Sequence, residues 1–393
     1  MINKIIFRKI YLFIIFCFFV IQPLNCLASQ EVMEIISAKG VVLKVEKTVK
    51  PADGADFIMN NTTSSLINYE EQKLQIKILS GQDKNKIVII TNDLRHNPFD
   101  LKAKEGNKVF LYGENINNET KYYVRDFWHL DSLIFLVILF FILVLWLGRF
   151  QGIKSLFALS ISLVIIFSVF IPLVQKGINP LNVAVLVSLI VSCLTLPIVH
   201  GFSLKALVSV TGTCGGVLTA VIFSLLINYF FQLNGLGTED MRIFAVSNPD
   251  FNFQGILFAG IIVGALGAIM DVAVSISSGL QEIRKHKPNI GFRELIASGM
   301  NIGRDIMGSM LNTLIFAYVG TSIAVILIIS QNGVGLMEFL NYGFVVEEII
   351  RSLIGSLGLL ATIPITAIAA GFIHDLSSKN SNYSTSVIDR KVV

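Results

Sequence analysis

The chain has 393 residues, of which 53% are hydrophobic and 15% are charged, and its formal net charge is +4. Soluble domains carry about 25% charged residues, so this composition, with a mean hydropathy of +0.70, excludes an ordinary soluble protein. The small net charge argues against nucleic-acid binding, which needs a clustered basic face. The four cysteines and five histidines have no metal-ligand spacing, so we expect no metal site and no cofactor.

Residues 1–28 have the pattern of a secretory signal peptide. Three basic residues precede the apolar run 10–21, and a stretch of small residues ends at Ala28. A basic region, a short apolar core and a small-residue cleavage site are the three parts of such a peptide. Cleavage after Ala28 and retention as an uncleaved anchor both remain open. Either one places the following segment outside the cytoplasm.

Residues 30–127 are expected to form a small exported all-β domain without disulfides. Basic and acidic residues balance there, and hydrophobic residues alternate with a period of two, as in half-buried strands. Five strands separated by turn residues are predicted, at 36–48, 74–78, 86–91, 107–112 and 121–127. Five short strands favour an OB-like barrel, and a small sandwich is the alternative.

Residues 128–375 are expected to form a membrane all-α helical bundle. Each of its apolar segments has about the 20 residues needed to cross a hydrocarbon core of ~30 Å. Seven transmembrane helices are predicted, at 130–147, 155–174, 180–199, 206–230, 254–278, 307–329 and 351–372. Residues 376–393 are expected to be a cytoplasmic tail.

The distribution of positive charge predicts the orientation of the bundle. If the β-domain is outside, the predicted inner loops contain Arg149, Lys205 and Lys285 with their basic neighbours, whereas the outer loops contain few basic residues. An excess of lysine and arginine marks cytoplasmic loops. The signal segment and the loop charges are independent, and both place the C-terminus in the cytoplasm.

The predicted fifth helix carries a polar and small-residue face. Its members recur at steps of three and four, which places them on one side of a helix: Gly260, Gly264, Gly267, Asp271, Ser275 and Ser278. The small residues predict close packing with a neighbouring helix. Asp271 is expected about two turns from the cytoplasmic end, where a carboxylate costs ~2.5–3.5 kcal/mol. It is either part of a cation or substrate path or a structural ion-pair partner.

Polar residues also precede the predicted sixth helix. Arg304 and Asp305 flank its expected start, and Asn301 and Asn312 share a helical face with Asp305. We expect Arg304 to pair with Asp271, because each charge offsets the desolvation of the other. The alternative is that Arg304 extends to the inner membrane surface. These five residues form the candidate intramembrane polar cluster.

No residue pattern indicates catalysis. The sequence has no nucleophile motif, P-loop, dinucleotide fingerprint or zinc-protease motif, so no catalytic residue is proposed and an enzyme is not expected. The first hypothesis is a secondary transporter or permease, whose partners are the lipid bilayer and a small solute or ion. The second is a non-transporting scaffold or sensor whose β-domain binds an envelope component. The oligomeric state is not predicted.

Two stretches carry a resemblance to a known family. The segments GALGAIMDVAVSISSGL and SGMNIGRDIMGSMLNTLIFAYVG lie within residues 260–320, and EEIIRSLIGSLGLLATIPITA covers 347–367. In these segments, and in the order of its parts, the chain resembles the YibE/F family of bacterial membrane proteins. The resemblance implies the cytoplasmic membrane of a bacterium. It implies no mechanism and transfers no site residues.

Overall fold

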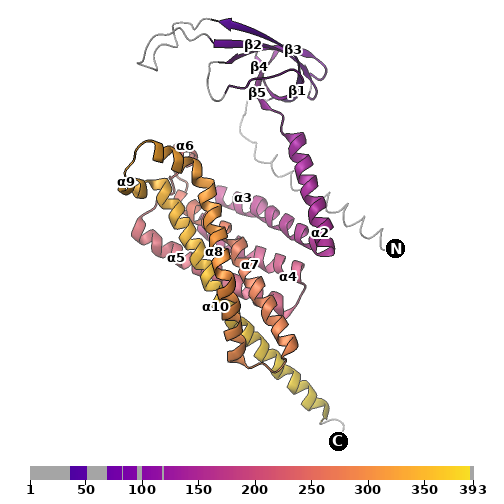
Figure 1. The fold of residues 1–393 in the computed structure, drawn as a ribbon, viewed down its shortest axis with the longest axis vertical. Coiled ribbons are helices and arrows are strands. Elements are labelled where there is room, and N and C mark those ends of the chain that lie inside the picture. The colour runs from indigo at the N-terminus through magenta and orange to yellow at the C-terminus, as the bar shows by residue number, and fades with distance from the viewer. Residues whose placement is uncertain (1–35, 51–68, 82, 95–99, 117–118, 390–393) are drawn as a thin grey trace, which may run out of the picture. The chain divides into compact units, whose positions relative to one another are not determined.

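The computed structural model describes residues 36–50, 69–81, 83–94, 100–116 and 119–389, and their side chains up to His374 except at positions 50, 69, 116 and 119 (Figure 1). The expected signal peptide at 1–28 lies outside the described residues. The chain divides into two compact units between Leu143 and Val144. One unit holds the strands and the beginning of the first helix, and the other holds the remaining helices.

The first unit is built on one five-stranded antiparallel sheet. Its strands are β1 (Ile36–Lys50), β2 (Tyr69–Ile78), β3 (Ile87–Leu94), β4 (Lys108–Ile116) and β5 (Glu119–Phe127). All five predicted strands are therefore confirmed. Their order is β3-β2-β1-β4-β5, and the sheet curls into a half-barrel that brings β3 close to β5. A sandwich needs two packed sheets, so the sandwich alternative is not what the described residues form.

Alternating apolar residues fill the concave side of the half-barrel. Leu74, Ile76 and Leu111 are fully buried, and the polar residues between them face outward. This is the period-two pattern of strands with one buried face. Gly40 in β1 lies so close to Ile76 and Leu111 that a Cβ atom there would overlap with Ile76. The half-barrel thus has its own hydrophobic core, separate from the core of the helical unit.

One buried hydroxyl joins β5 to the β2–β3 turn. Tyr122 donates a hydrogen bond of 2.9 Å to the Asp83 carboxylate, which also accepts from Lys86. Burial, and then the hydrogen bond to Asp83, raise the pKa of Tyr122 to about 12. The hydrogen bonds from Lys86 and Tyr122 lower the pKa of Asp83. Both shifts favour the neutral phenol beside an ionised carboxylate.

The raised pKa of Tyr122 predicts an alkaline limit to the stability of the half-barrel. Its stabilising contribution is complete below the ordinary tyrosine pKa of 10.0 and is lost as the pH rises towards about 12. We expect Tyr122→Phe to lower the melting temperature at neutral pH, and to reduce the further loss of stability between pH 10 and 12. Melts of residues 30–127 by circular dichroism measure both, with Tyr123→Phe as the control. An unchanged alkaline loss in Tyr122→Phe would contradict this assignment.

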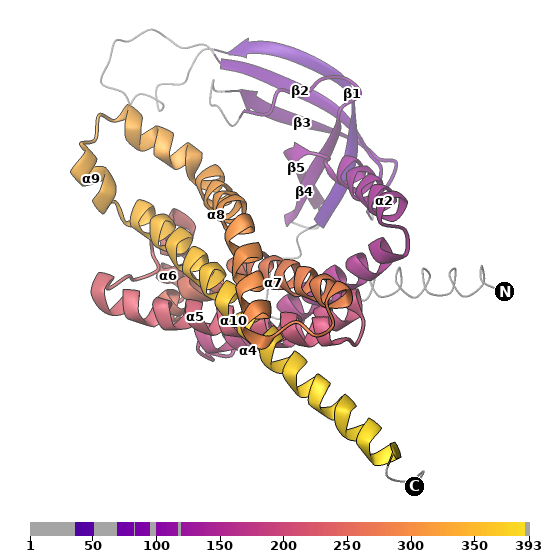
Figure 2. The same cartoon turned by 60° about the horizontal axis from the view of Figure 1, so that its bottom comes forward.

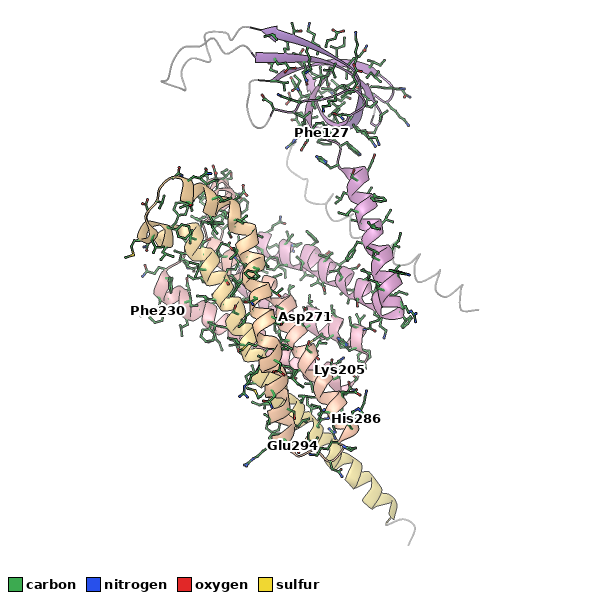
Figure 3. All side chains as sticks on the ribbon, in the orientation of Figure 1. Phe127, Lys205, Phe230, Asp271, His286 and Glu294 are labelled. Carbon is green, nitrogen blue, oxygen red and sulfur yellow. The ribbon has the colours of Figure 1, made fainter. Side chains whose placement is uncertain are left out.

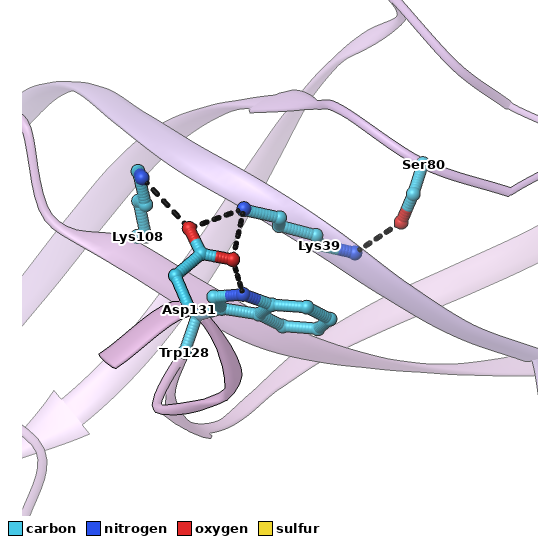
Figure 4. A network of polar contacts seen from close by, with 5 residues as sticks. All are labelled: Lys39, Ser80, Lys108, Trp128 and Asp131. Carbon is cyan, nitrogen blue, oxygen red and sulfur yellow. Dashed lines mark hydrogen bonds and ion pairs between the residues drawn. The ribbon is translucent and has the colours of Figure 1, made fainter. Parts of the chain in front are cut away.

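A polar clamp connects the half-barrel to the first turn of the first helix (Figure 4). The Asp131 carboxylate accepts hydrogen bonds from Lys39 Nζ at 2.8 and 3.0 Å, Lys108 Nζ at 2.9 Å and Trp128 Nε1 at 2.8 Å. The Lys39 ammonium also lies 5.0 Å from the centre of the Trp128 ring. Exposed ion pairs are screened by water, so each contributes little to stability on its own. Three donors from β1, β4 and the β5–helix linker nevertheless fix the direction in which the helix leaves the sheet.

Within the part of the chain that the structure describes, six helical segments are long and apolar enough to cross a membrane. The first runs from Leu130 to Gln175 as α2 (Leu130–Ile165), the π-helical turn η3 (Ile166–Phe170) and α3 (Ile171–Gln175). The others are α4 (Pro180–His200), α5 (Leu204–Phe231), α7 (Phe253–His286), α8 (Phe292–Gln331) and α10 (Gly343–Asp389). Two short helices, α6 (Glu239–Ser247) and α9 (Leu336–Asn341), lie in connections.

Seven separate spans are not confirmed, because the segments predicted at 130–147 and 155–174 belong to one helical run. That run is not straight. Arg149 has φ 47° and ψ −127°, which no α-helix contains, so the backbone bends sharply there. Arg149 lies between the two predicted segments.

Small residues bring α10 against α5 and α8, and Figure 2 shows α10 passing beside both α7 and α8. On α5, Gly212 and Gly216 lie directly against the hydroxyls of Thr366 and Thr362 of α10, with no room for a Cβ atom. On α8, Gly303 meets Ile363 of α10 in the same way. Glycines four residues apart let helices approach closely where lipid provides no hydrophobic driving force. These contacts hold the bundle together.

Candidate functional site

The glycine face of α7 is an open surface in this chain. Gly260, Gly264, Gly267 and Asp271 are all exposed. The Arg351 guanidinium lies near Gly260 and the Tyr318 hydroxyl lies near Gly264, whereas nothing lies within 4 Å of a Cβ atom built at Gly267. Among the described residues, close approach to this face is therefore limited to Tyr318 at Gly264, and Gly267 has no close neighbour. The other half of α7 is buried against α4, α5 and α10 and already provides the packing surface.

Two serines complete this face towards the C-terminal end of α7. Ser275 and Ser278 are half-buried, and the Ser278 hydroxyl donates to the Val274 carbonyl of its own helix at 2.6 Å. A short distance further along, Ile302 of α8 covers Gly279. The face is therefore partly covered at both ends by α8 and α10 and is open between Gly267 and Asp271.

Asp271 lies deeper in the bundle than the sequence predicts. α7 continues to His286, roughly 22 Å beyond Asp271 at 1.5 Å per residue. Two residues before Asp271, Ile269 approaches Gly216, which is in the middle of α5. Figure 3 shows Asp271 far from His286 and Glu294, which mark the C-terminal end of α7 and the N-terminal end of α8. The carboxylate is thus near the middle of the bundle, not two turns from its end.

Arg304 and Asp305 are also at mid-depth. α8 begins at Phe292, so Arg304 is about 18 Å into the helix rather than at its start. Its neighbour Gly303 contacts Ile363, and the adjacent Thr362 contacts the middle of α5 at Gly216. The expectation that Arg304 lies at a helix start was wrong. The apparent start was a stretch of polar residues inside a longer helix.

The structure does not assemble the expected polar cluster. Among the described residues Asp271 makes no ion pair or hydrogen bond, so the expected pair with Arg304 is absent. Arg304 instead donates to Asn301 at 3.2 Å within α8. The reason is the rotation of α8, which turns Ile302 towards α7 and Gly303 towards α10 and leaves Arg304 exposed. Asn301, Asp305 and Asn312 are exposed on α8 as well.

Sequence reasoning missed a second polar group at the other end of α7. Arg351 Nε lies 3.2 Å from Glu348 Oε1, and both side chains are at least three-quarters buried. The Tyr318 hydroxyl is buried between α8 and the glycines of α7 and has no hydrogen-bond partner among the described residues. Buried Glu347 accepts a 3.1 Å hydrogen bond from the Gly237 backbone. The sequence did contain a signal for this group: Glu347 and Glu348 precede Arg351 by four and three residues in an apolar helix.

Two cavities flank the first turns of α10. One, of about 260 Å³, is mostly apolar, with Tyr318, Ser322, Glu348 and Ser352 as its polar lining. The other, of about 450 Å³, includes Glu347. Among the described residues no group of three or more histidine, cysteine, aspartate or glutamate side chains is placed to hold a metal ion. The described side chains thus place separated single charges in mostly apolar surroundings.

Comparisons with known proteins decide the family. The model of the YibE/F-like proteins matches residues 136–375, and the model of the YibE/F family N-terminal domain matches residues 39–127. The chain belongs to the YibE/F family. The first match covers most of the helical part of this YibE/F protein, and the second covers most of its half-barrel. Searches of the curated proteins and of the solved structures return no significant match.

Membership of the YibE/F family and six apolar helices together identify a membrane protein. Both of the polar stretches described above, on α7 and α8, lie inside the matched range of the family.

Proposed function

We propose that this protein is a permease for a small solute or ion, most simply a cation, and that the open face of α7 is part of its path. The observation that carries the proposal is Asp271, an exposed carboxylate without a partner among the described residues, at the middle of the bundle. A charge at that depth costs ~2.5–3.5 kcal/mol if it faces lipid, and such residues usually face a watered cavity.

The neighbours of Asp271 support a role in a transport path rather than a structural link between helices. Gly267 has no side chain, and no other group fills the space beside it. The buried Tyr318 hydroxyl and the Glu348–Arg351 pair lie further along α7, at Gly264 and Gly260. A cation moving along this face would meet a hydroxyl and then a carboxylate. If Asp271 only linked two helices structurally, its carboxylate would need a hydrogen-bond or ion-pair partner.

Replacing Asp271 by asparagine should abolish or strongly reduce transport without unfolding the protein, because asparagine keeps the shape and polarity but removes the charge. Purified protein in liposomes, with radiolabelled sodium and rubidium ions and an internal pH-sensitive dye, measures the flux. Glu282→Gln, at the exposed end of the same helix, is the matched control and should retain full flux. Wild-type liposomes no more permeable than protein-free ones would contradict a cation path.

We further propose that the first helical run crosses the membrane twice. At 1.5 Å per residue its 46 residues extend roughly 69 Å, about twice a bilayer core of ~30 Å. Gln151 donates a 3.0 Å hydrogen bond to the Val199 carbonyl near the end of α4. Gln175 leads directly to the start of α4 at Pro180. Because α4 spans the membrane, Gln151 and Gln175 belong on opposite sides.

This topology places the half-barrel outside and both Gln151 and the C-terminus in the cytoplasm of a bacterial cell. Single cysteines at Lys104, Gln151 and Lys285, in a background without native cysteines, test it. An impermeant maleimide added to intact cells should label position 104 only, and permeabilised cells should show all three. Labelling of position 151 from outside would contradict the double crossing, and labelling of 285 would contradict the orientation.

A scaffold or sensor role is the second candidate, and one feature of the half-barrel favours it. Ile87 and Ile89 on the edge strand β3 are 54% and 74% exposed. Exposed apolar residues on a sheet edge can pair with an extended segment of another protein. If Ile89→Lys abolished the cellular role while ion flux was unchanged, the half-barrel would be the functional part.

A further inference from the structure

The second exposed stripe, on α8, repeats every seven residues, whereas two steps of four residues follow one another on the α7 face, and this points to a different role. Its members follow one another at steps of four and three residues: Asn301, Asp305, Gly308, Asn312, Ile315 and Val319. All six are exposed, and they run along one side of the helix. The strict alternation of steps of four and three residues repeats every seven residues, which is the repeat of a coiled-coil seam.

This stripe is unsuited to lipid. Only 17% of the most apolar stretch of α8 is buried, against 56% for α7 and α10. The most apolar stretch of the first helical run is 0% buried, but that stretch is wholly apolar and fits a lipid environment. On α8, by contrast, Arg304 and Asp305 are exposed at the depth of Gly303, near the middle of the bundle. Charges at that depth need a protein partner or water.

We propose that α8 is the dimer interface of this protein, where it pairs in parallel with α8 of a second copy. Two copies inserted in the same orientation are related by a two-fold axis along the membrane normal. Each residue of one α8 then meets residues at the same depth of the other, so the stripe must be complementary to itself.

The stripe meets that requirement at each polar position. In a parallel coiled coil, the residue before a core position lies beside the core residue of the partner helix. Arg304 of each copy therefore lies beside Asp305 of the other, which gives two ion pairs at one level. Gly308 lets the helices approach closely, and the space around it is open. Asn312 both donates and accepts, so it can bond to its own counterpart.

We infer that the partner of α8 is a second copy of this chain, because the basic Arg304 and the acidic Asp305 are adjacent on one helix. A different partner would need its own acid and base at matching depths, whereas a second copy supplies them automatically. A single polar residue at a core position fixes the register of a parallel pair, and Asn312 has that position here. The pairing involves neither Asp271 nor flux, so it stands or falls independently of the transport proposal.

Disulfide cross-linking in native membranes tests the pairing. In a variant with Cys17, Cys26, Cys193 and Cys214 replaced by serine, Gly308→Cys and Asn312→Cys are each oxidised with copper phenanthroline. We expect most of each protein to shift to a disulfide-linked dimer. Thr313→Cys, exposed but off the stripe, is the matched control and should remain largely monomeric. Equal cross-linking at all three positions, or none at 308 and 312, would overturn the proposal.

Charge substitutions test the ion pairs at the centre of the stripe. Arg304→Asp places four acids at one level of the dimer and Asp305→Arg places four bases there. Each should therefore lower the dimer fraction, measured by light scattering in mild detergent. The double exchange restores two opposite pairs and should recover the dimer. If the single variants dimerise as fully as the wild type, or if the double variant is no better than either single one, Arg304 and Asp305 do not pair across copies.

Discussion

Gly212→Ala should be among the most destabilising single-methyl changes in the helical unit. A Cβ atom at position 212 would overlap with the Thr366 hydroxyl, which already donates to the Thr362 carbonyl within α10. Overpacking of this kind costs ~1–3 kcal/mol, and two long helices cannot separate locally to relieve it. We expect less folded protein in the membrane and an earlier thermal transition in detergent, measured by fluorescence-detected size exclusion after heating.

The contact itself provides the control. Thr366→Ala removes the hydroxyl and should partly rescue Gly212→Ala, so that the double variant is more stable than Gly212→Ala alone. Gly267→Ala adds the same methyl group to an open face and gains about 1 kcal/mol of helix propensity. It should therefore be at least as stable as the wild type. A Gly267→Ala variant as unstable as Gly212→Ala would show that α7 has a close neighbour that this chain does not provide.

Leu111→Ala should have the largest effect on the half-barrel. Leu111 is fully buried in β4, and truncation of a buried leucine costs ~2–5 kcal/mol because a cavity remains. For a domain of this size that corresponds to a melting temperature lower by about 10 °C or more. Circular dichroism melts of residues 30–127 measure the change.

Ile89→Ala is the matched comparison, since it truncates an aliphatic strand residue that is 74% exposed. It should shift the melt by only a few degrees. Similar losses in the two variants would mean that Ile89 is covered in solution, for instance by self-association through the β3 edge. A half-barrel that melts without cooperativity in the wild type would mean that it needs the membrane unit to fold.

The half-barrel could be predicted from the sequence because its strands and turns are marked by patterns among neighbouring residues. Alternation marks each strand, and turn glycines such as Gly81 and Gly106, which have positive φ, separate them. The same reasoning located the membrane helices but misjudged their ends. The polar stretch before residue 307 suggested a loop, yet α8 starts at Phe292, because a helix continues through polar residues if one side has tightly packed partners such as Gly299 and Gly303.

The candidate site was harder to predict, because helix rotation is not a local property. A stripe of small residues on α7 suggested a packing face, but the tight packing occurs at Gly212 and Gly216 on α5, which meet threonines of α10. Spacing identifies which residues share a face and leaves open which helix that face meets. For the same reason the residues of the polar stripes were predicted correctly as members of helical faces, whereas the ion pair between Asp271 and Arg304 was not found.

The clamp at Asp131 also gives the protein an internal optical reporter. Of its two tryptophans, Trp128 donates to the clamp carboxylate while Trp146 is 73% exposed on the first helical run. In a Trp146→Phe variant the emission would come from Trp128 alone, whose indole lies beside a carboxylate and an ammonium group. Its fluorescence would change whenever the sheet and the helix separated. A ligand captured by the half-barrel could then be detected at the base of the helix without any added label.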